Sequence, residues 1–266
     1  MQSKVWAVVA IVLFGAAIAI YILPNREAEP LPPLLETTPP LTAPIAQPET
    51  APAEPAIAHP LETIAPVEPL PDLEQSDPSI FKPLIQVLGE QWKALLKPEA
   101  LIHKIVVTVD NLPRKDLPAK VVPLKRVKGA FLTSGKGNAL SISVQNPQRY
   151  SSYVRLIQSV DTEKLVDLYR QFYPLFQRAY IEIGYPKGYF NDRLVEAIDD
   201  LLASPEPDEP IKLVQPKILF KYADPELEAR SAGQKIMMRM GRDNAGQLKT
   251  KLREIRQHVA KVPRTP

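Results

Sequence analysis

Carboxylates are the residues of this chain whose types and spacing come closest to a catalytic pair. Glycan cleavage needs two carboxylates held several ångströms apart across the sugar. Asp192 and Glu196 share one face of an expected helix, and Glu182 precedes them in an expected loop. A helix N-terminus would stabilise Asp192 as an anion, which is unfavourable for a general acid. The charged face of a solvated helix therefore explains this pair better than a glycosidase site does.

Motifs for nucleophilic catalysis and for phosphate binding are incomplete. Ser231 and Lys235 are four residues apart rather than three, so the Ser-x-x-Lys pattern fails, whereas Ser231 with Gln234 fits a helix capping box. Five residues separate Gly129 from Gly135, and a glycine follows Lys136, so a hairpin turn is favoured over a Walker phosphate loop. We therefore favour a protein that is not an enzyme, and we assign no catalytic residue.

Metal and thiol chemistry is not expected either. The sequence contains no cysteine and three histidines. Neither His103 nor His258 has a second potential ligand three or four residues away that would suit a metal. We therefore expect no metal and no cofactor.

Aromatic residues concentrate in the middle of the chain. Ten of the 18 aromatic residues lie between residues 150 and 190, and seven of these are tyrosines interleaved with basic residues. Tyrosine has an apolar body and a polar tip, so the cluster forms either an aromatic core or a surface that stacks sugars or docks a protein. The candidate ligand or partner surface consists of Tyr169, Tyr173, Tyr180, Tyr185, Tyr189, Arg178 and Lys187.

Two further stretches are basic. The candidate basic patch, which precedes the expected hairpin, consists of Lys120, Lys125, Arg126 and Lys128. The last helix carries more cations beside an apolar seam spaced by four and three residues, namely Leu248, Leu252, Ile255, Val259 and Val262. This seam is under three heptads long, so packing on its own domain is favoured over a coiled coil with a partner.

The elements that must position these residues are expected to be mostly helices. Apolar residues recur at helical spacing after residues 77, 98, 161, 191 and 224. Asp77, Asp161 and Asn191 are expected to cap three of these helices. The β-branched run 105–109 also allows a strand, although we favour a helix. Glycine-rich residues 134–138 connect two extended segments. The predicted fold class is mainly α, a multi-helix domain with a small β-hairpin.

A transmembrane anchor is predicted at residues 5–23, after a cytoplasmic tail of residues 1–4. The run carries no charge, and as a helix it would span about 29 Å, the thickness of the hydrocarbon layer. It is longer than the apolar core of a signal peptide, and no small-residue cleavage site follows it. Lys4 favours an N-terminus that stays inside. We expect a single-pass protein of the bacterial inner membrane with its C-terminal domain in the periplasm.

A proline-rich acidic linker is predicted at residues 24–77. It holds 14 of the 30 prolines and has a net charge of −9, a composition typical of disordered chain. The remaining domain, residues 78–266, has a net charge of +11. That charge favours anionic partners, and the expected compartment disfavours nucleic acid. The opposite charges also allow the linker to fold back on the domain.

Several short motifs resemble those of one protein family. They are Val107–Pro113, Leu168–Arg170, Tyr173–Gln177, Ile183–Pro186, Tyr189–Leu194, Ala223–Glu228 and Ser231–Lys235. Over roughly residues 80–260 the chain is similar to an uncharacterised proteobacterial membrane-anchored family, the domain of unknown function three thousand and fourteen. The resemblance implies an anchor, a proline-rich linker and one envelope domain, and it implies no activity.

These observations predict a non-enzymatic accessory or adaptor protein of the cell envelope. Its partners would be the membrane, through the anchor, and an envelope protein or an anionic wall polymer, through the basic domain. The alternative is a module that binds or cleaves cell-wall glycan, using the tyrosine-rich region with Glu182 or Asp192.

Overall fold

The computed structural model of the chain describes residues 56–66 and 69–260. In this part of the chain the elements, with η for 3-10 helices, are η1 (Leu73–Gln75), α2 (Asp77–Leu88), η2 (Glu90–Ala94), α3 (Leu101–Asn111), η3 (Ala119–Val121), β1 (Thr133–Ser134), η4 (Gly137–Ala139), β2 (Ser141–Ile142), α4 (Gln148–Gln158), α5 (Thr162–Glu182), α6 (Phe190–Leu202), β3 (Leu213–Val214), β4 (Lys221–Tyr222), α7 (Pro225–Glu228), α8 (Ala232–Arg239) and α9 (Arg242–Val259).

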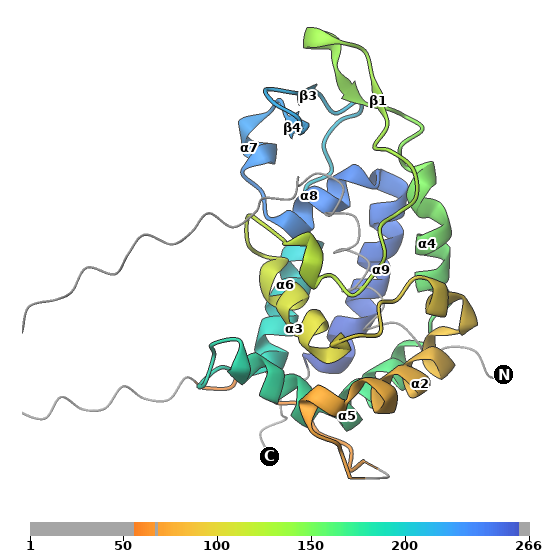
Figure 1. Ribbon diagram of the computed structural model, residues 1–266. Coiled ribbons are helices and arrows are strands. Elements are labelled where there is room, and N and C mark those ends of the chain that lie inside the picture. Colours follow the sequence, from red (N-terminus) through yellow and green to blue (C-terminus); the bar gives the residue numbers. More distant parts are fainter. Residues whose placement is uncertain (1–55, 67–68, 261–266) are drawn as a thin grey trace, which may run out of the picture.

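Helices dominate the described residues, which confirms the predicted mainly helical domain. Helix α3 packs against α5 and α6, while α9 packs against α4, α5 and α6. Helices α2 and α5 lie at one end of the molecule, and the two β-hairpins lie at the opposite end (Figure 1). The β-branched run 105–109 lies within α3 and is helical, as favoured.

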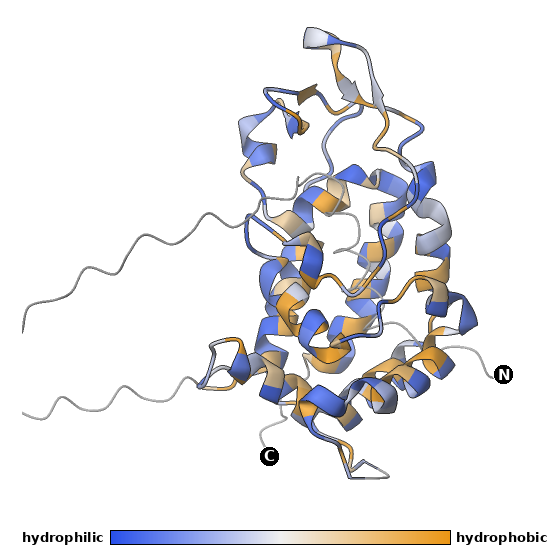
Figure 2. Ribbon diagram, in the orientation of Figure 1, coloured by the Kyte–Doolittle hydropathy of each residue, from blue (hydrophilic) through white to orange (hydrophobic). Residues whose placement is uncertain are grey.

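One large core lies between these helices. Trp92, Phe176 and Phe190 are among its largest fully buried side chains. Figure 2 shows apolar and polar stretches alternating along the helices, as expected for helices that bury one face. The apolar seam of α9 from Leu248 to Val259 is buried in this core. The prediction that the seam packs on its own domain is confirmed for these residues, and Val262 lies outside the described residues.

Two short antiparallel hairpins form a separate end of the domain. β1 pairs with β2, and β3 pairs with β4, so the predicted hairpin is present together with a second one. The backbone bond from Ile142 to Ile211, 2.9 Å long, joins the two hairpins. A second small core lies beneath them and reaches Met238 of α8. Gly135 has φ +76, and a Cβ there would lie 2.2 Å from the carbonyl oxygen of Ala139, so only glycine fits this turn.

Asp77 and Asn191, two of the predicted helix caps, form hydrogen bonds with other segments instead of capping the helices predicted for them. Asp77 is the first residue of α2, but its carboxylate accepts hydrogen bonds from the backbone N–H groups of Ala100 and Leu101 at 2.6 and 2.8 Å. It therefore caps α3. Asn191 lies inside the first turn of α6 and is buried, with its amide directed to other parts of the chain. Asp161 occupies the predicted N-cap position of α5, but its side chain makes no capping hydrogen bond to the described first turn.

The C-terminal part of the predicted linker is folded where the structure describes it. Leu61 is buried in the main core, and Leu73 is in η1 and packs against that core. The prediction of disorder is therefore wrong for these residues, because their apolar side chains have a core to enter. The predicted tail 1–4, the anchor 5–23 and the linker up to residue 55 lie outside the described residues. Within the described ranges, no helix has the length and apolar character needed to cross a membrane.

Candidate functional site

A buried carboxylate, Asp110, lies where three segments that are distant in sequence meet. It is in the last turn of α3 and is 6% exposed. Arg193 of α6 donates to it through Nε at 3.0 Å, and the Arg114 guanidinium lies 2.9 Å away. The Tyr185 hydroxyl, from the loop after α5, donates at 3.3 Å. A buried carboxylate is costly unless it is paired and hydrogen-bonded, and donors of this chain meet that need here.

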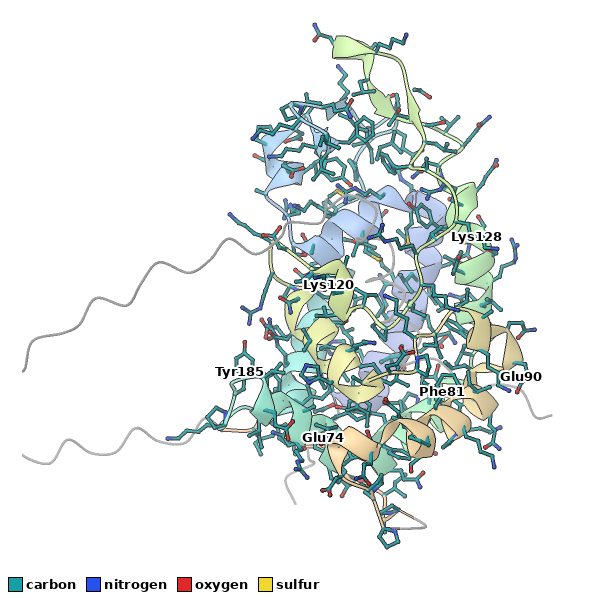
Figure 3. The ribbon with its side chains drawn as sticks, in the orientation of Figure 1. Glu74, Phe81, Glu90, Lys120, Lys128 and Tyr185 are labelled. Atoms are coloured by element: carbon teal, nitrogen blue, oxygen red, sulfur yellow. The ribbon has the colours of Figure 1, made fainter. Side chains whose placement is uncertain are left out.

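The surroundings of Asp110 indicate a structural clamp rather than a proton-transfer site. Arg193 also contacts Glu196 at 2.6 Å, so the guanidinium bridges two carboxylates. The Tyr180 ring stacks on Tyr185 with 4.5 Å between ring centroids. Burial is the main cause that raises the pKa of Tyr180 to about 12, and the negative charge of Asp110 adds to it. Tyr180 therefore stays protonated at neutral pH, and the cluster ties α3, α5 and α6 together. Figure 3 labels Tyr185.

Most of the predicted tyrosine surface is buried. Tyr169, Tyr173 and Tyr180 are 2%, 5% and 6% exposed. Tyr169 and Tyr173 meet edge to face, with 5.5 Å between ring centroids. Burial raises the pKa of Tyr169 well above its ordinary value. The prediction that these three offer a ligand surface is therefore wrong, because this face of α5 is turned into the core. Tyr185 and Tyr189 are half-buried.

The polar residues near these tyrosines hold an upstream stretch of chain, which we call the docked segment, residues 58–61. Asp192 accepts hydrogen bonds from the backbone N–H groups of Ala58 and His59 at 3.0 and 2.7 Å. The Tyr189 hydroxyl accepts from the N–H of Leu61 at 2.9 Å. The amide of Asn191 donates to the carbonyl of His59 at 2.8 Å. Asp192 is thus a docking residue in the structure.

Arg178 and Lys187 are the two cations of the predicted surface, and both are exposed. Arg178 pairs with Glu182 at 3.1 Å and with Asp72 at 3.2 Å. Its partner Asp72 comes from the predicted linker, so part of the linker's negative charge meets the positive charge of the domain. The pair with Asp72 is solvent-exposed and contributes little to stability. No ion pair joins Lys187 to another residue that the structure describes.

A family model, described as "Protein of unknown function (DUF3014)", matches residues 101–256. This chain belongs to the DUF3014 family. The match begins at the first residue of α3 and ends within α9. The Asp110 cluster therefore lies inside the DUF3014 region, while α2 and the docked segment precede it. No curated protein and no solved structure matches the chain.

Within the DUF3014 region, the predicted basic patch is solvent-exposed. Lys120, Lys125, Arg126 and Lys128 are all exposed, and among the described residues none of them forms a salt bridge. Figure 3 labels the two ends of this stretch, Lys120 and Lys128. The backbone beneath the patch is fixed, since the N–H of Lys125 donates to the carbonyl of Leu95 at 2.8 Å.

A neighbouring lysine adds one more cation close to the basic patch of the DUF3014 region. Lys97 donates through Nζ to the carbonyl of Val122 at 3.1 Å. Its pKa is lowered, first by burial and then by repulsion from Lys104 and Arg126. Burial disfavours the charged form of this lysine, and the neighbouring cations add to that effect. The four exposed patch cations, rather than Lys97, make the patch suited to an anion.

Sequence patterns single out the basic patch of the DUF3014 region but not its buried charge cluster. Asp110 and Arg114 are four residues apart, a spacing that permits an ion pair on one helix. This spacing predicts the pair with Arg114. No sequence pattern predicts the contact between Asp110 and Arg193, which are 83 residues apart. In the described ranges, no group of three or more His, Asp or Glu side chains could hold a metal ion.

Proposed function

We propose that this protein is a non-enzymatic accessory of the bacterial envelope whose basic patch binds an anionic partner, a wall polymer or an acidic envelope protein. The proposal includes a single membrane-spanning anchor at residues 5–23, an N-terminus inside, and a domain held in the periplasm. The uncharged run in the sequence supports the anchor. The patch residues Lys120, Lys125, Arg126 and Lys128 support the binding role.

The observation that carries the proposal is the exposure of these four cations on one short stretch. A cation that is already paired in the fold must break that pair before it can bind a partner. The patch cations have no such pair among the described residues. Lys97, whose Nζ donates to the carbonyl of Val122, adds one more cation near the patch. A fixed group of unpaired like charges attracts an oppositely charged surface and steers its approach.

The arrangement gives no comparable support to the glycan alternative. Its two carboxylates are engaged within the chain, Glu182 with Arg178 and Asp192 with the docked segment. Three of the five tyrosines that would stack sugars are buried in the core. We therefore propose partner binding through charge, and we do not propose glycan cleavage.

Co-sedimentation with purified cell-wall sacculi tests the proposal. The full-length chain is used in an uncharged detergent, at low and at high salt. In the test variant, Lys120, Lys125, Arg126 and Lys128 are all changed to Gln. Exposed ion pairs contribute about 0.2–1 kcal/mol each, so binding at low salt should weaken by roughly fivefold or more. Salt should reduce the binding of the unmodified chain, because it screens exposed charges.

A matched control separates this patch from the overall charge. It changes Lys82, Lys136, Lys217 and Arg155 to Gln, which removes the same number of exposed positive charges elsewhere. Equal weakening in both variants would mean generic attraction by net charge and would contradict the patch. If sacculi do not bind the unmodified chain, the patch variant and the control variant are compared with it by in-cell crosslinking to envelope proteins. A crosslink that persists in the test variant would overturn the proposal.

A further inference from the structure

A cleft of about 200 Å³ opens beside α8. The loop after α3 forms one wall through Lys115, and the β3–β4 hairpin forms the other through Lys221. Helix α8 contributes Ala232, Lys235 and Arg239, which are three and four residues apart and so share one face. Figure 1 shows β3, β4 and α7 gathered at this end of α8. The cleft is formed by segments from three separate parts of the sequence.

Arg239 is the unusual residue of this cleft. It is 93% buried, and its guanidinium lies over the Tyr222 ring at 5.3 Å from the centroid. Within the described residues, no carboxylate pairs with it and its guanidinium donates no hydrogen bond. A buried arginine is ordinarily paired, because desolvating an unpaired charge is costly. When a guanidinium is stacked on an aromatic face, its N–H edge remains able to donate to a planar or tetrahedral oxyanion.

The other charges of the cleft leave a positive excess. Lys115 and Lys221 are exposed at its rim. Glu228 engages Lys235 in two ways. Nζ of Lys235 lies 3.7 Å from the carboxylate of Glu228 and donates to the backbone carbonyl of Glu228 at 3.3 Å. The second carboxylate oxygen of Glu228 already accepts from the N–H of Tyr222 at 2.9 Å. With Asp116 included, four cations line the cleft against two carboxylates.

We propose that this cleft binds a phosphate group, with Arg239 as the residue that recognises it. An arginine fork matches phosphate oxygens with two parallel hydrogen bonds, and lysines add point charges at the edge. Lys221 and Lys115 can approach the remaining oxygens from the rim. The apolar side chains of Leu219 and Phe220 line the same space, which leaves room for an organic group carrying the phosphate.

This site shares no residue with the basic patch, so each proposal can fail while the other holds. The patch presents exposed cations to a surface, whereas the cleft offers one buried guanidinium to a small group. A variant lacking the four patch cations should therefore keep its phosphate affinity.

Isothermal titration calorimetry on the full-length chain in an uncharged detergent tests the site. The probes are inorganic phosphate and glycerol 3-phosphate, titrated at constant ionic strength. We expect saturable binding in the millimolar range or tighter. Arg239→Lys keeps the charge but loses the fork and should weaken binding by about tenfold or more. Lys82→Gln, which removes an exposed charge outside both the cleft and the basic patch, should leave binding unchanged.

Arg239 is buried, so its variant must first be shown to be folded by circular dichroism and thermal unfolding. If it is not folded, the exposed pair Lys115→Gln and Lys221→Gln replaces it, and together they should weaken binding severalfold. Tighter binding of glycerol 3-phosphate than of phosphate supports an organic ligand, and equal binding supports phosphate itself. The absence of saturable binding of either probe below about 50 mM would overturn the proposal, as would unchanged affinity in the folded Arg239→Lys chain or in the lysine pair.

Discussion

The carboxylate of Asp192 accepts a hydrogen bond of 2.7 Å from the backbone N–H of His59, a residue 133 positions earlier in the chain. Its other oxygen accepts from Ala58 at 3.0 Å. Asp192 is the third residue of α6, so the helix N-terminus favours its negative charge and strengthens it as an acceptor. A proline-rich segment has few intrinsic partners for its backbone, and here α6 supplies them. The described chain therefore already contacts the folded domain at residues 58–61, upstream of the predicted domain start at residue 78.

Asp192→Ala should release the docked segment while leaving the helical domain folded. The substitution removes both acceptors, and bonds to a charged acceptor contribute about 1.5–3 kcal/mol. We expect hydrogen exchange at the amides of Ala58 and His59 to accelerate by on the order of tenfold or more. Hydrogen-exchange mass spectrometry on the full-length chain measures this, with thermal unfolding of the domain recorded in parallel.

Asp208→Ala is the matched control for this measurement. Asp208 is an exposed carboxylate whose closest cation, Arg242, lies 4.0 Å away. Its removal should leave exchange at His59 unchanged. If Asp192→Ala behaves like this control, Asn191 and Tyr189 hold the segment without help from the carboxylate.

Asp110→Asn should destabilise the domain strongly, because two guanidinium groups face this one buried carboxylate. Breaking a buried ion pair by removing one charge costs about 3–5 kcal/mol. Arg114 is half-exposed and can be solvated by water instead. Most of the lost stability therefore comes from the buried pair between Arg193 and Asp110. For a domain of this size we expect the thermal midpoint to fall by about 10 °C. Circular dichroism melts measure it, and Arg114→Gln should cause a much smaller change. Equal effects of the two substitutions would contradict the assignment of Arg193 as the main partner.

Sequence periodicity was sufficient to predict features that depend on near neighbours. Amphipathic spacing identified α3, α5 and α6, and the glycine-rich loop identified the β1–β2 hairpin. The capping residue Ser231 was also predictable, since its hydroxyl accepts from the N–H of Gln234 at 3.0 Å. Even there the prediction is incomplete, because the Gln234 amide donates to Asp200 at 3.0 Å and so joins α8 to α6.

The remaining features depend on pairings between distant segments, which a single sequence does not reveal. Tyr169 and Tyr189 have the same side chain, yet one is in the core and the other receives the docked segment. Arg239 follows two methionines and looks like an ordinary helix cation. Its burial results from the β3–β4 hairpin, which places Tyr222 against it. Proline content predicted disorder for the linker, but α5 and α6 offer its last residues a surface.

Acid pH should weaken the contact between Glu206 and the buried Lys249. Nζ of Lys249 donates to Glu206 and to the carbonyl of Ser204, both at 2.8 Å. Lys249 lowers the pKa of Glu206 below its ordinary value of 4.5. Because the folded pKa lies below the unfolded one, the contribution is complete above about pH 4.5 and is lost as the pH falls through the lowered pKa.

Urea unfolding between about pH 3 and pH 7 measures this dependence. Glu206→Gln should be less stable than the unmodified chain near pH 7, and the difference should shrink toward the acid end. Glu209→Gln, an exposed carboxylate of the same loop, is the control and should show no such convergence. A difference that stays near zero over the whole range would mean that the carbonyl of Ser204 alone satisfies Lys249, and a constant loss would mean that the charge of Glu206 is not its source.

Leu252→Ala should reduce stability without changing the oligomeric state. Leu252 lies in the middle of the α9 seam and is fully buried within its own domain. Removing a buried leucine side chain costs about 2–5 kcal/mol, depending on how far the neighbours close the cavity. A seam that served a coiled-coil partner would instead change the mass of the assembly when truncated. Thermal unfolding and light scattering on the same sample separate these cases. A loss of mass with little change in the thermal midpoint would contradict the intramolecular packing of α9.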